Sequence, residues 1–77
     1  MSEKERKILQ RICIKMKFKD LLFNAKRGFE ENFRAEYREL YGMIFYMEGV
    51  GDISEENGAK VKKLARTISK KYNILRY

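Results

Sequence analysis

Hydrophobic residues recur at steps of three and four along most of the chain, which predicts helices. The first expected helix runs from about residue 3 to 27 and begins at a capping box, in which Ser2 is followed three residues later by Glu5. One apolar side of this helix consists of Ile8, Leu9, Ile12, Cys13 and Met16, and another consists of Ile14, Phe18, Leu22 and Ala25. Because the pattern changes side near Lys17, we expect a helix that is buried on two sides or that bends there.

A second helix is expected from about residue 29 to 48. Its core-facing side consists of Phe29, Phe33, Tyr37, Leu40, Tyr41, Ile44 and Met47. Gly28 follows two cations and precedes Glu30 and Glu31, which is typical of one helix ending and the next beginning. One continuous helix from 3 to 48 is the alternative, because a single glycine costs only about 1 kcal/mol inside a helix.

A third helix is expected from about residue 54 to 72. The two glycines between 49 and 51 allow a reversal, and Ser54 is a good N-cap that Ile53 precedes as a hydrophobic staple. The apolar side consists of Val61, Leu64, Ala65, Ile68, Tyr72 and Leu75. The short connections predict an all-α fold, a small three-helix bundle with antiparallel neighbouring helices, forming a single domain over residues 1–77.

Charge is sorted along the chain. Residues 1–27 carry nine Lys/Arg against three acids, residues 28–52 two against six, and residues 53–77 seven against two, within a total of +7. A body of this kind exposes positive surface to an anionic partner. The bias toward Lys, Ile, Phe, Tyr and Asn is typical of an AT-rich coding sequence, as in low-GC bacteria and their phages or mobile elements.

Two basic stripes carry the functional hypothesis. Each occupies one side of a predicted helix: Lys4, Lys7, Arg11 and Lys15 on the first, and Lys62, Lys63, Arg66 and Lys70 on the third. Because 11 lysines outnumber 7 arginines, contacts with a phosphate backbone are favoured over base reading. We therefore expect a small non-enzymatic protein that binds nucleic acid or a ribonucleoprotein, as a regulator or inhibitor of a nucleic-acid-handling complex. The alternative is an ordinary solvated lysine face.

A protein-interaction module or homodimeric adaptor that binds a host protein is the competing hypothesis. Its surface would consist of the residues that lie off the main core faces and in the apolar tail: Ile14, Phe18, Met43, Tyr46, Leu75 and Tyr77. A membrane is not an expected partner, because no segment approaches the roughly 18 apolar residues of a span and the third helix has no Trp or Phe on its apolar side.

The sequence offers few side chains that are commonly catalytic. The chain has no His and only one cysteine, Cys13, which we interpret as a small core residue. Neighbouring acids such as Glu36 and Glu39 are expected on a solvated face. We therefore predict no enzyme, no metal, no cofactor and no small-molecule substrate. The lone cysteine and the charged N-terminus without a signal-type apolar segment favour the cytoplasm.

Overall fold

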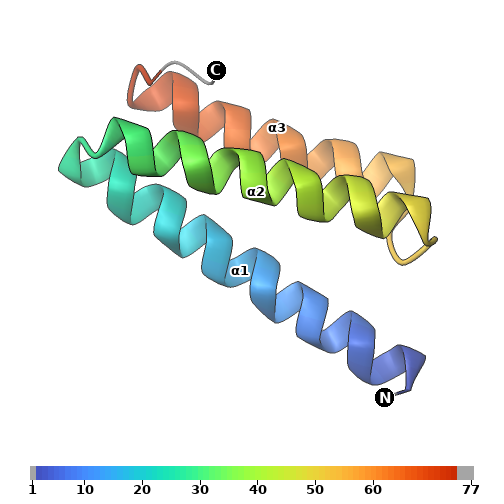
Figure 1. Ribbon diagram of the computed structural model, residues 1–77. Helices are drawn as coiled ribbons and strands as arrows, with labels where there is room; N and C mark the ends of the chain where they lie inside the picture. Colours follow the sequence, from blue (N-terminus) through green and yellow to red (C-terminus); the bar gives the residue numbers. More distant parts are fainter. Residues whose placement is uncertain (1, 75–77) are drawn as a thin grey trace.

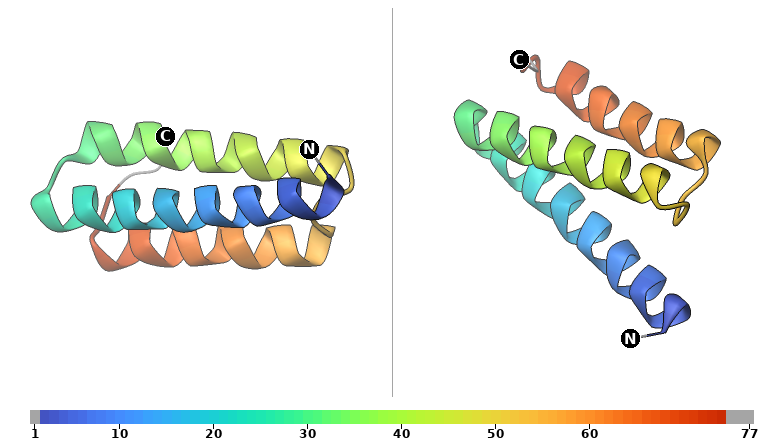
Figure 2. Two further views of the ribbon diagram at one scale, coloured as in Figure 1. Left: turned by 90° about the horizontal axis from the view of Figure 1, so that it is seen from below. Right: turned by 45° about the vertical axis from the view of Figure 1, so that its right-hand side comes forward.

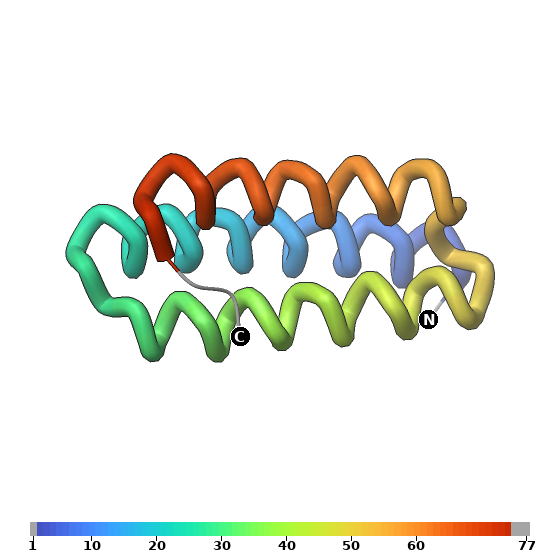
Figure 3. The backbone as a smooth tube through the Cα atoms, turned by 90° about the horizontal axis from the view of Figure 1, so that it is seen from above, coloured from blue at the N-terminus to red at the C-terminus, as the bar shows by residue number. Residues whose placement is uncertain are grey.

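The computed structural model describes residues 2–74, which form three helices joined by two short connections (Figure 1). The helices are α1 (Glu3–Arg27), α2 (Glu30–Gly49) and α3 (Glu55–Lys71). Each helix packs against the other two; α1 lies between α2 and α3 in the left-hand view of Figure 2 and in Figure 3, and it diverges from both toward its N-terminal end (Figure 1). The predicted three-helix bundle with antiparallel neighbours is confirmed.

The connection between α1 and α2 depends on Gly28. Its φ of 75° is in the left-handed region, and its N–H donates to the Ala25 carbonyl, with N and O 3.2 Å apart. The N–H of Phe29 donates to the Asn24 carbonyl at 2.9 Å, which completes the cap. The predicted break is confirmed, and the alternative of one continuous helix is wrong.

Serine hydroxyls cap the other two helix starts. Ser2 Oγ accepts a hydrogen bond from the N–H of Glu5, and Ser54 Oγ accepts one from the N–H of Asn57, both at 3.1 Å. Gly51, with a φ of 79°, reverses the chain between α2 and α3. These starts were predictable because capping depends on residues a few positions apart.

The core is built mainly from α2. The buried apolar residues are Leu21, Ala25, Phe33, Tyr37, Leu40, Ile44, Met47, Ala65 and Ile74. Apart from the exposed side of α1, three residues expected on core faces are exposed instead. Leu22 projects about 100° away from the buried Leu21. Phe29 precedes the first turn of α2 and is outside its buried stripe, and Leu64 lies at the edge of the side that Ala65 buries. Ile74, which follows α3, is buried against the core, and its carbonyl accepts a hydrogen bond from the buried Ser69 hydroxyl at 2.5 Å.

Only one of the two apolar sides of α1 packs against the core. Ile14 and Phe18 pack against the core beside the buried Leu21. The opposite side, which includes Ile8, Leu9, Ile12 and Met16, is exposed, so the expectation of burial on two sides is wrong. Figure 1 shows α1 passing residue 17 without a sharp kink. Cys13 is on the exposed side, so its interpretation as a core residue is also wrong.

Candidate nucleic-acid interface

Three cations of the α3 stripe are available to a ligand. Lys63, Arg66 and Lys70 are exposed, on the side of α3 opposite the fully buried Ala65. No residue that the structure describes forms an ion pair with them. Their charges are therefore not neutralised within the described chain.

Lys62 belongs to the packing between α2 and α3. Its Nζ is 3.4 Å from Glu48 Oε1 and 5.8 Å from the centre of the Tyr41 ring, and its side chain is only 27% exposed. Gly58 is buried at the same contact, where an added Cβ would lie 2.1 Å from Glu48 Oε1. The prediction that Lys62 projects into solvent with the stripe is wrong, because the carboxylate of a neighbouring helix attracts it inward.

The α1 stripe likewise retains three of its four cations. Lys4, Arg11 and Lys15 are exposed and form no ion pair with a described residue, whereas Lys7 Nζ is 3.2 Å from Glu3 Oε1, one turn earlier. A shallow hollow of about 550 Å³ follows the first turns of α1 and is lined by Glu3, Lys4, Lys7, Ile8 and Arg11. This surface therefore combines cations with one aliphatic side chain.

The two stripes are on adjacent helices. Arg11 lines a small pocket together with Ile53 and Asn57, at the start of α3. The two helices pack against each other, and Figure 1 shows that they diverge toward the N-terminal end of α1. Six unpaired cations are thus distributed over two packed helices: Lys4, Arg11, Lys15, Lys63, Arg66 and Lys70.

Two acids of α2, Glu36 and Glu39, are paired with Lys17 of α1. The Lys17 ammonium donates to Glu36 Oε2 at 2.8 Å and also to Glu39 Oε2. These hydrogen bonds raise the pKa of Lys17 well above its usual range. On the α1 helix, Lys17 projects about 140° away from the centre of the Lys4, Arg11 and Lys15 stripe. Glu36 and Glu39 are therefore on a different side of α1 from Lys4, Arg11 and Lys15.

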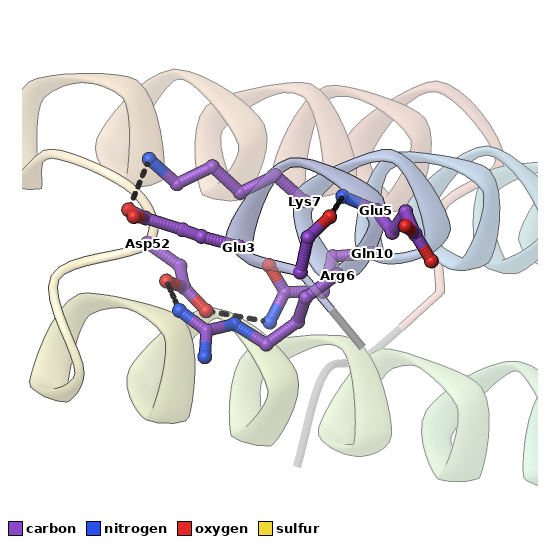
Figure 4. A network of polar contacts seen from close by, with 7 residues as sticks. Glu3, Glu5, Arg6, Lys7, Gln10 and Asp52 are labelled. Atoms are coloured by element: carbon purple, nitrogen blue, oxygen red, sulfur yellow. Dashed lines mark hydrogen bonds and ion pairs between the residues drawn. The ribbon is translucent and has the colours of Figure 1, made fainter.

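A polar network fixes the N-terminal end of α1 to the turn between α2 and α3 (Figure 4). Arg6 Nη2 donates to Asp52 Oδ1 at 2.6 Å, and Gln10 Nε2 donates to Asp52 Oδ2 at 2.8 Å. The Asp52 side chain is only 2% exposed, and its pKa is lowered, mainly by the Arg6 hydrogen bond and then by Gln10. This contact was not predicted from the sequence, although an acid in a glycine turn beside two basic helices was a possible signal.

The apolar surface expected for a protein partner is not a single exposed patch. Ile14 and Phe18 pack against the core, Met43 is partly buried, and only Tyr46 is largely exposed. Leu75 and Tyr77 are outside the described residues. Sequence reasoning also missed Phe45, which is 77% exposed on α2.

Neither a metal centre nor a membrane span was found over residues 2–74. No group of three or more potential ligands is suitably placed for a metal ion, and no helix combines the length and apolarity that a bilayer crossing requires. Comparison with known proteins does not add a function, because no family model, curated protein or solved structure matches the chain significantly.

Proposed function

We propose that the protein is a non-enzymatic binding protein for nucleic acid or a nucleic-acid-handling complex, which it regulates or inhibits by occupying a phosphate-bearing surface. The observation that supports this proposal is that six of the eight cations in the two stripes are exposed and form no ion pair with a described residue: Lys4, Arg11, Lys15, Lys63, Arg66 and Lys70. We call these six residues the basic surface. Lys7 and Lys62 are excluded because they form ion pairs with Glu3 and Glu48.

The dimensions of the basic surface suit a polyphosphate. The stripe from Lys4 to Lys15 extends about 16 Å along α1, and that from Lys63 to Lys70 about 10 Å along α3. Duplex DNA carries one charge per roughly 1.7 Å of axis, so each stripe can contact several phosphates. Four of the six cations are lysines, which favours recognition of backbone or shape over the bidentate reading of bases.

The direct test is the affinity of purified protein for labelled duplex DNA, single-stranded DNA and structured RNA, measured by fluorescence anisotropy. The variant with Lys63→Gln, Arg66→Gln and Lys70→Gln is expected to bind at least about tenfold more weakly to the preferred polymer at low salt. Circular dichroism should show unchanged helicity, because all three side chains are exposed.

A matched pair of single variants tests whether binding depends on a defined site or only on the net charge of the protein. Arg66 on α3 and Arg38 on α2 are both exposed arginines without an ion pair to a described residue. Arg66→Gln should weaken binding clearly more than Arg38→Gln. Equal effects of the two substitutions would show that binding depends on overall charge and not on a defined site. Failure to bind any of the three polymers at low salt would reject the proposal.

A further inference from the structure

A second surface of α1 has the spacing of a coiled-coil seam. Steps of four and three alternate through six positions, Glu5, Leu9, Ile12, Met16, Lys19 and Phe23, which we call the α1 seam. The core-facing residues Ile14, Leu21 and Ala25 are on the opposite side of the helix. The α1 helix therefore carries one apolar side for its own fold and a second one that the fold does not require.

The apolar residues of the α1 seam are not covered by the described chain. Leu9, Ile12, Met16 and Phe23 are 46%, 47%, 59% and 52% exposed, whereas Leu21 on the opposite side is fully buried. An aligned row of this kind is typical of an interaction site rather than of scattered surface residues.

Aromatic and cationic groups extend the α1 seam at its C-terminal end. Phe29 packs edge-on to Phe23 with ring centres 6.4 Å apart, and the Arg27 guanidinium lies 5.0 Å from the centre of the Phe23 ring. Phe29 remains 46% exposed in this arrangement. The end of the seam is therefore an accessible apolar platform with a cation beside it.

The charge beside the α1 seam selects the chemistry of its partner. Among the described residues, α1 presents six cations without an ion pair and only two such carboxylates, Glu5 and Asp20. Lys19 is within the seam, and Lys26 occupies the next position of the same repeat. Carboxylates on an opposing helix would neutralise these cations, whereas a second copy would bring together surfaces of the same net sign.

The composition of the α1 seam favours a helix over a lipid surface. Two of its six positions, Glu5 and Lys19, are charged, whereas a helix that lies in a bilayer interface keeps its charged residues on the opposite side. Lys19 further narrows the apolar area between Met16 and Phe23.

We infer that the α1 seam binds an acidic amphipathic helix of a partner protein, which packs along α1 as a coiled coil. The seam residues are not part of the basic surface, and although Lys4, Arg11 and Lys15 add to the positive charge of α1, the inference does not require that the protein binds nucleic acid. Binding places apolar partner side chains against Leu9, Ile12, Met16 and Phe23, and carboxylates against Lys19 and Lys26.

The test uses synthetic helical peptides with Leu and Ile at the core positions of a heptad repeat. One peptide carries Glu at the flanking positions and opposite Lys19, and its control carries Lys at the same positions. Isothermal titration calorimetry on the full chain should give one-to-one binding of the acidic peptide and no binding of the basic one. Ile12→Glu with Met16→Glu should weaken binding by at least about tenfold, because buried carboxylates would have no partner. Phe45→Glu, on another helix, should leave the affinity unchanged.

Other occupants give distinct results that overturn the inference. Failure to bind the acidic peptide, or equal binding of both peptides, removes the selectivity on which it depends. Sedimentation equilibrium that shows a dimer abolished by Ile12→Glu would assign the α1 seam to a second copy. Binding to phosphatidylglycerol vesicles without peptide binding would assign it to a lipid surface. Because Ile12→Glu and Met16→Glu retain the basic surface, failure here is distinguishable from failure of nucleic-acid binding.

Discussion

The two parts of α1 differ sharply in how they are held. The C-terminal part, residues 17–27, contributes the buried residues Leu21, Asn24 and Ala25. The N-terminal part, residues 3–16, contributes no buried residue; it is attached by Ile14, which packs against the core, and by the hydrogen bonds of Arg6 and Gln10 to Asp52. The first part stabilises the bundle, while the second carries the cations and apolar side chains that remain available for binding. One continuous helix thus combines a structural part, residues 17–27, with a part that presents side chains for binding, residues 3–16, which we call the presented part.

The largest expected effect comes from truncating equivalent leucines in the two parts. Leu21→Ala removes a fully buried side chain and should cost about 2–5 kcal/mol of unfolding free energy. Leu9→Ala removes the same atoms from a side chain that is 46% exposed and should cost less than about 1 kcal/mol. Urea denaturation followed by circular dichroism measures both, and similar losses would contradict the division of α1.

The next effect concerns the first residue of the structural part. Lys17→Ala removes the ammonium that Glu36 and Glu39 share and should cost about 1 kcal/mol. Lys19→Ala is the matched control, because Lys19 is exposed and forms no ion pair with a described residue. Denaturation midpoints that shift equally would show that the Lys17 contacts contribute no stability.

Asp52→Asn should loosen the presented part without unfolding the bundle. Amide hydrogen exchange over residues 7–14 should accelerate relative to wild type, while the amides of α2 are unaffected; Asp20→Asn, at an exposed acid, should leave both regions unchanged. Exchange that is equally slow in both variants would show that Asp52 does not hold α1.

The same carboxyl gives a pH dependence of defined sign. Because the pKa of Asp52 is lower in the folded chain than in the unfolded one, its stabilisation is complete above pH about 4 and is lost as the pH falls further. The thermal midpoint of wild type should therefore decrease more steeply below pH 4 than that of Asp52→Asn. Parallel curves would contradict this role.

The smallest expected effect is at Cys13. Because the thiol is exposed on the presented part, iodoacetamide should modify it at nearly the same rate in native protein as in urea, with little change in helicity. Strong protection in the native state would restore the interpretation of Cys13 as a core residue.

Local signals in the sequence explain which features were predictable. The helix starts at Ser2 and Ser54 and the break at Gly28 depend on neighbouring residues, so they were predicted correctly. The buried side of α1 was not predictable, because both of its sides carry apolar residues at helical spacing and only packing against α2 and α3 distinguishes them. The ion pair of Lys62 was not predictable for the same reason, since its partner Glu48 is 14 residues away on another helix.

The dependence of affinity on salt tests the central claim, that the basic surface of α1 and α3 binds phosphates. The logarithm of the association constant for the preferred polymer should fall linearly with the logarithm of salt concentration. The variant with Lys63→Gln, Arg66→Gln and Lys70→Gln should show a slope that is shallower by about one for each phosphate contact removed. Identical slopes for wild type and variant, or no binding at low salt, would contradict the claim.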